Sequence, residues 1–121
     1  MQIPKPREQD KELFRSVVPD LPGVTVKPMF GNLGAFVNGN MFAGLFGSAI
    51  GIRVLDDTVR AELEAIEGTA PFGPSERPMG GYVALPPNWT AEPDLIARWI
   101  VRSLAQVAAL PVKKPKPKTG K

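Results

Sequence analysis

Any chemistry in this chain must work without histidine or cysteine, because the 121 residues contain neither. Their absence excludes Ser/His and Cys/His nucleophile pairs, zinc sites built on Cys and His, haem ligation by His, and disulfide bonds. A metal would have to be held by oxygen ligands, and the acidic residues are dispersed instead of converging on one loop. We therefore expect no metal, no cofactor and no catalytic residues.

The carboxylates that stand closest together are better explained by helix structure than by catalysis. Asp56 and Asp57 are adjacent, so their side chains point apart, and both stand at an expected helix start, where a carboxylate accepts hydrogen bonds from free backbone amides. Glu62, Glu64 and Glu67 follow on the same helix and are interpreted as its solvated side. Neither group has the partners that acid-base catalysis needs.

Glycines cluster in the first half of the chain, as they do in some phosphate-binding loops. These glycines are not followed by the Gly-Lys-Ser/Thr ending of such a loop, and they interrupt expected strands instead of opening a helix. We interpret them as turn and bulge glycines. The cluster consists of Gly31, Gly34, Gly39, Gly44, Gly47 and Gly51.

Four residues form a candidate interaction surface. Phe72 and Met79 are the large apolar residues of a Pro- and Gly-rich loop over 69–81, where a core role and a surface role remain equally open. Trp89 stands between prolines and a helix start, which favours packing at the end of the core over contact with a partner. Arg77 either staples the loop or binds a carboxylate, and stapling is the favoured interpretation.

The spacing of apolar residues predicts three helices that frame these candidates. The first ends at Pro19, the second begins at Asp56 or Asp57 and ends near Gly68, and the third begins with Thr90 as its N-cap. Their inward residues recur three or four positions apart: Leu13, Phe14, Val17 and Val18; Val59, Leu63 and Ile66; and Ile96, Trp99, Ile100, Leu104 and Val107.

Alternating apolar residues predict a meander of four strands and a fifth strand after the loop. The four strands lie within 24–30, 35–37, 41–46 and 50–54, and the fifth within 82–85. The dipeptide Asn38-Gly39 predicts a type I′ hairpin turn. The expected fold is therefore α+β, with an antiparallel sheet of about five strands and helices at the N-terminus, in the middle and at the C-terminus.

The positive charge of the chain is concentrated at its C-terminal end. The whole chain carries +3, whereas residues 1–110 hold ten basic and twelve acidic residues, a net charge of −2. Residues 111–121 alternate proline and lysine, and we expect a folded domain over 1–110 followed by a disordered basic tail. The lysines of the tail are Lys113, Lys114, Lys116, Lys118 and Lys121.

The N-terminal residues are charged and lack the apolar segment of a signal peptide. The most apolar stretch, 41–52, is interrupted by glycines and is too short to cross a bilayer. We expect a cytoplasmic protein with no membrane contact.

Ordered short motifs run through the middle of the chain: Met29, Phe30 and Gly31; Gly34; Asn38 and Gly39; Met41, Phe42 and Ala43; 51–56; Pro71 and Phe72; Arg77, Pro78 and Met79; and Tyr82. Together they resemble the TfoX N-terminal domain family, named for the TfoX/Sxy regulators of DNA-uptake competence, from about Leu13 to about Leu110. The resemblance implies a two-layer α+β domain, related in shape to secretion-chaperone-like folds, and supplies no catalytic residues. Those regulators carry a second, C-terminal helical domain, so this chain resembles the stand-alone members.

The leading functional hypothesis is a non-catalytic regulatory or adaptor domain that acts through protein contact, as a homodimer or with another protein. It rests on large apolar residues in strands and loop beyond what a one-faced sheet needs: Met29, Phe30, Met41, Phe42, Phe46, Phe72 and Met79. The alternative is a nucleic-acid-associated regulator that grips phosphates with the lysine tail. An enzyme that uses Arg77, Tyr82 and a carboxylate is the weakest hypothesis.

The lysine tail generates a prediction about nucleic acid. Five lysines neutralise at most five phosphates, so duplex affinity should fall with a log-log salt slope no steeper than about −4.5 and should ignore sequence. Fluorescence anisotropy with labelled DNA and RNA at several salt concentrations measures this slope. Deletion of residues 111–121 should abolish the binding, and sequence-selective binding by the truncated protein would contradict the tail hypothesis.

Overall fold

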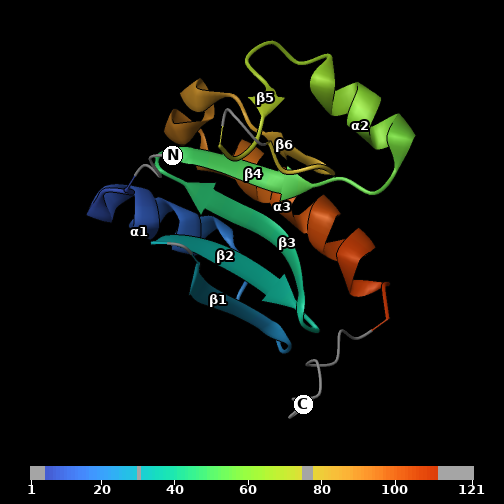
Figure 1. The fold of residues 1–121 in the computed structure, drawn as a ribbon, viewed down its shortest axis with the longest axis horizontal. Coiled ribbons are helices and arrows are strands. Elements are labelled where there is room, and N and C mark those ends of the chain that lie inside the picture. Colours follow the sequence, from blue (N-terminus) through green and yellow to red (C-terminus); the bar gives the residue numbers. More distant parts are fainter. Residues whose placement is uncertain (1–4, 30, 75–77, 112–121) are drawn as a thin grey trace, which may run out of the picture.

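The computed structural model describes residues 5–29, 31–74 and 78–111. These residues form an α+β domain in which three α-helices and a short 3-10 helix accompany an antiparallel sheet of six strands (Figure 1). The predicted fold class is confirmed. In chain order the elements are α1 (Glu8–Val17), β1 (Val24–Met29), β2 (Asn32–Val37), β3 (Asn40–Phe46), β4 (Ala49–Arg53), α2 (Asp57–Glu64), β5 (Ala70–Pro71), β6 (Tyr82–Ala84), η1 (Pro87–Ala91) and α3 (Pro93–Ala108).

The sheet has the strand order β1-β2-β3-β4-β6-β5. Its first four strands form the predicted meander, and β6 pairs with β4 through Gly51↔Ala84 and Ile52↔Val83. One strand more than expected is present, because β5 pairs with β6 inside the segment that was predicted to be a loop. A strand of two residues, one of them proline, is too short to produce an alternating pattern in the sequence.

The β2–β3 hairpin combines the predicted turn with a bulge. Asn38 has a φ of 52° and Gly39 a φ of 83°, the two positive values that a type I′ turn requires. The pairing then shifts between Ala35 and Phe36, which leaves one extra residue in β3. Because of this bulge, Phe42 and Ala43 both lie in the core even though they are consecutive.

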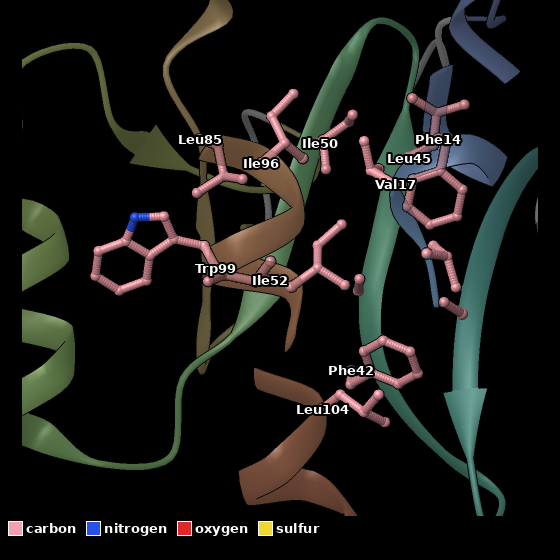
Figure 2. Close-up of a cluster of buried hydrophobic side chains, with 14 of the residues drawn as sticks. Phe14, Val17, Phe42, Leu45, Ile50, Ile52, Leu85, Ile96, Trp99 and Leu104 are labelled. Atoms are coloured by element: carbon pink, nitrogen blue, oxygen red, sulfur yellow. The ribbon is translucent and has the colours of Figure 1, made fainter. Parts of the chain in front are cut away.

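The core lies between the sheet and the two long helices. α1 and α3 cover the same face, and Figure 2 shows Phe14 and Val17 beside Leu45, with Leu104 beside Phe42. Burial of each such side chain contributes about 1.5–3 kcal/mol relative to exposure. The large side chains that are fully buried are Phe14, Phe42, Ile52, Leu63, Ile96, Ile100 and Val107.

One buried hydroxyl joins α3 to the sheet. Ser103 Oγ lies 2.8 Å from the carbonyl oxygen of Phe42 and 2.7 Å from that of Arg53, so it can donate a hydrogen bond to either strand. A buried carbonyl group without a partner costs about 1–3 kcal/mol, and the single hydroxyl proton can satisfy either of these two. Ser103 therefore fixes the position of α3 on β3 and β4.

The predicted N-cap of α2 is confirmed, whereas the predicted N-cap of α3 is wrong. Asp56 is the predicted N-cap of α2, and its side chain accepts hydrogen bonds from the amides of Thr58 and Val59. Thr90 does not cap the last helix, contrary to the prediction. Its hydroxyl instead donates to Pro87 within η1, and α3 begins three residues later at Pro93 because the 3-10 turn takes up Trp89 and Thr90.

In residues 5–29, 31–74 and 78–111, no helix is long and apolar enough to cross a membrane.

The first turn of α1 depends on a buried carboxylate. Asp10 accepts hydrogen bonds from the backbone amide of Arg7 (2.9 Å) and from its guanidinium (3.1 Å). The guanidinium hydrogen bond is the main reason why the pKa of Asp10 is lowered. The ionised carboxylate therefore stabilises the folded state at any pH above the pKa it has in the unfolded chain.

We predict that Asp10→Asn destabilises the protein at neutral pH and that the difference from wild type shrinks as the pH falls. The contribution is fully present above about pH 4, the ordinary pKa of aspartate, and is lost as the pH passes through the lower folded-state value. Urea titrations of both proteins between neutral and acid pH measure the difference. Glu12→Gln, which removes an exposed carboxylate from the same helix, is the control, and a constant difference for Asp10→Asn would refute the prediction.

Candidate interaction surface

The outer face of the sheet, opposite α1 and α3, carries a row of glycines. Gly34 pairs with Gly44, and Gly44 pairs with Gly51, so the three stand side by side on β2, β3 and β4. We call the shallow channel above them the glycine trough. The prediction of turn and bulge glycines is wrong for these three, which lie inside strands because side chains from elsewhere need the space above them.

The other three glycines of the cluster are turn glycines, as predicted. Gly31, Gly39 and Gly47 all have positive φ angles, between 64° and 83°. Each lies next to or between two paired strands.

The aromatic ring of Phe72 occupies the glycine trough. A Cβ atom added at Gly51 would overlap Cγ and Cδ1 of this ring, and one at Gly44 would lie 3.2 Å from its Cζ. The ring is 3% exposed and also contacts Phe46 (centroids 6.3 Å apart) and Tyr82 (6.1 Å). Phe72 therefore packs against the sheet, and its place in an interaction surface stays a prediction.

Backbone and side-chain hydrogen bonds hold the segment that carries Phe72 against the sheet. The amide of Met79 donates to the carbonyl oxygen of Phe72 (2.8 Å), and Pro71 pairs with Val83. The hydroxyl of Tyr82 donates to the carbonyl oxygen of Met41 (3.2 Å), and burial raises the pKa of this tyrosine. These contacts hold Pro71, Phe72 and Met79 over part of the outer face.

An apolar cleft of about 210 Å³ lies beside the Phe72 ring. It is walled by residues of β1, β2 and β3 on one side and by Phe72, Pro74 and Met79 on the other. We call it the apolar cleft. Among the described residues it is lined by Met29, Asn32, Leu33, Met41, Gly44, Leu45, Phe46, Phe72, Pro74 and Met79.

The charged residues on the outer face of the described strands are all basic. Lys27 stands on β1 opposite Gly34, and its ammonium group lies 4.4 Å from the centre of the Phe36 ring. Arg53 stands on β4 opposite Tyr82. Its positive charge lowers the pKa of this tyrosine and so partly offsets the rise that burial causes. Neither Lys27 nor Arg53 has a carboxylate partner among the described residues.

A second hollow, of about 410 Å³, lies between α2 and the β5–β6 segment and has both polar and apolar walls. Its main charged groups, Arg60 and Glu64, form an ion pair with a 3.5 Å separation. In the part of the chain that the structure describes, no three Asp or Glu residues stand close enough to hold a metal ion.

The structure brings two of the four candidate contact residues together. Phe72 and Met79 meet at the apolar cleft, whereas Trp89 is 9% exposed and belongs to the core on the opposite side of the sheet. Trp89 therefore packs in the core, which is the favoured interpretation, and its role in a partner surface stays a prediction. Arg77 and the tail lysines Lys113, Lys114, Lys116, Lys118 and Lys121 lie outside the described residues.

The sequence analysis named Met29, Met41 and Phe46 only among the large apolar residues that exceed what a one-faced sheet needs. Because side chains alternate between the two faces of a strand, the sequence indicates which residues of a strand share a face. The bulge in β3 reverses this alternation at Met41. Nothing local indicated that the three converge on one cleft with Met79.

The glycine trough leads to a prediction about stability. Gly51→Ala should destabilise the protein by about 1–3 kcal/mol, because the new methyl group overlaps Cγ and Cδ1 of the Phe72 ring, so the ring or the strand must shift. Gly80→Ala is the matched control, since nothing lies within 4 Å of its Cβ position, and it should change stability by less than about 0.5 kcal/mol.

Chemical denaturation of both variants measures these changes. A double-mutant cycle with Phe72→Ala identifies the contact, because Gly51→Ala should cost much less once the ring is gone. An equal cost in both backgrounds would show that the Phe72 ring does not occupy the trough.

Two comparisons with known proteins bear on this fold and surface. A search of curated proteins found no match. The family model described as the TfoX N-terminal domain matches residues 12–107, which run from within α1 to near the end of α3 and include the glycine trough and the described lining of the apolar cleft. Because this match covers well over half of the 121 residues, the chain belongs to the TfoX N-terminal domain family.

Proposed function

We propose that this domain is a non-catalytic regulatory or adaptor module that acts by binding protein, either a second copy of itself or another protein, on the outer face of its sheet. The observation that carries the proposal is the apolar cleft. Its lining places methionine and aromatic side chains around a partly open hollow on the sheet face that the long helices leave free. Concave apolar surfaces with a polar surround are typical of protein contact sites.

The β1 edge of the sheet is a poor alternative for such contact. The amide of Val24 donates to the carbonyl oxygen of Leu21 (3.0 Å), which turns it away from β2, and the nitrogen of Pro28 lies on the same side and carries no hydrogen. Val26 thus keeps the one outward amide of β1. An edge blunted in this way resists the addition of another strand, which favours contact through the face.

The polar groups near the cleft support binding over catalysis. Tyr82 donates its hydroxyl proton to a backbone carbonyl, and Arg60 is paired with Glu64. A catalytic site needs a nucleophile or base within reach of a group that activates or orients it. The described residues around the cleft supply apolar contact area instead.

Site-specific photocrosslinking in living cells tests the proposal. A photoreactive residue at Met79 lies on the outer face, and one at Val101, which is 49% exposed on α3, provides the control on the opposite side. We expect discrete protein adducts from position 79 and none, or far fewer, from position 101. Mass spectrometry then distinguishes a second copy of the chain from another protein.

Two results would contradict the proposed function. Equal adducts at both positions would mean that contact with the outer face is nonspecific. Adducts with nucleic acid alone would favour the alternative function, in which the lysines of residues 111–121 attach the domain to phosphates.

A further inference from the structure

We propose that the apolar cleft binds one large apolar side chain of a partner segment whose flanking residues are acidic. This inference rests on the proposed function, because it assumes that the outer face binds protein. It adds the chemistry of the segment that is bound.

The size of the cleft favours a single side chain. Pockets for drug-sized ligands occupy about 300–1,000 Å³, whereas a cavity of about 150 Å³ in another protein holds one benzene molecule. At about 210 Å³ the apolar cleft has room for one aromatic ring or branched aliphatic group with its linking carbon. Protein interfaces concentrate their binding energy in such anchor side chains.

The chemistry of the walls favours an apolar anchor. Met29, Met41 and Met79 come from two strands and the covering segment, and Phe46 and Phe72 contribute rings. Methionine side chains adapt to the shape of an inserted group, and their sulfur atoms make favourable contacts with aromatic rings. Asn32 is the polar residue of the described lining, and its side-chain oxygen already accepts a hydrogen bond from the amide of Gly47 (2.7 Å).

The charge around the cleft favours acidic flanks. Lys27 is two residues before Met29 on the same strand and lies over Phe36, which approaches the space above Gly34 together with Met41. Arg53 lies on the other side of the Phe72 ring, next to Tyr82. Residues 1–110 carry a net charge of −2, so these two cations, which have no carboxylate partner among the described residues, make the outer face a local exception that attracts carboxylates.

Methionine methyl NMR provides the test, because three of the four methionines line the cleft. The full-length protein is labelled with carbon-13 at its methionine methyl groups and titrated with short synthetic peptides. The peptides carry a central Phe with acidic flanks, a central Ser with the same flanks, or a central Phe with basic flanks. We expect the first peptide to shift the methyl resonances of Met29, Met41 and Met79 and to bind most tightly.

Charge-reversed variants test the role of the flanks. The double variant Lys27→Glu/Arg53→Glu should weaken binding of the acidic Phe peptide on the order of three- to tenfold, the effect of two exposed charge pairs. The control is Arg15→Glu/Arg98→Glu, which makes the same change of net charge on exposed positions of α1 and α3. This control should bind the peptide almost as well as wild type does.

Several outcomes would overturn the inference. Equal shifts from the Ser peptide would exclude an apolar anchor, equal or tighter binding of the basic peptide would exclude acidic flanks, and unmoved methionine resonances with all peptides would exclude the cleft. Binding of single-stranded DNA in place of the peptides, with the same methyl shifts, would assign the face to nucleic acid. Protein adducts that still form at Met79 in cells would leave the proposed function intact while this inference fails.

Discussion

The packing of Phe72 into the glycine trough is the contact on which the outer half of this domain depends. Gly44 and Gly51 on adjacent strands leave room for the ring, and a Cβ atom at Gly51 would overlap it. The ring in turn fixes the covering segment, whose amide at Met79 bonds back to the carbonyl oxygen of Phe72. Without this contact the sheet would expose its outer face, and the apolar cleft would lose one of its walls.

The bulge in β3 connects that outer face to the core. It turns Met41 outward, toward Gly44 and the cleft, while Phe42 and Ala43 both turn inward. Ser103 then donates to the carbonyl oxygen of Phe42, so the irregular strand is secured by α3. A single inserted residue thus determines which side chains form the core and which form the candidate contact surface.

The sequence was sufficient for the elements whose cause is local. Asn38-Gly39 specified its turn through positive φ angles, and Asp56 specified the start of α2 through free amides. The sequence was insufficient where a residue's position depends on tertiary contacts. Phe72 is an example, because its burial depends on glycines more than twenty residues away in the chain. The sequence did contain a signal for this pairing. Gly44 and Gly51 are each three residues from the Gly47-Ser48 turn, so a hairpin at this turn pairs them. Gly34 and Gly44 are not equally distant from the Asn38-Gly39 turn, and the one extra residue of the bulge accounts for the difference.

The central claim is that the Phe72 ring lies above Gly44 and Gly51, and proton NMR of the native protein tests it most directly. A ring stacked on these residues must shift their Hα resonances well upfield and give nuclear Overhauser contacts between those protons and the ring. We predict both effects for Gly44 and Gly51 and neither for Gly80, which has nothing within 4 Å of its Cβ position. Hα resonances near their random-coil positions, without contacts to Phe72, would contradict the account.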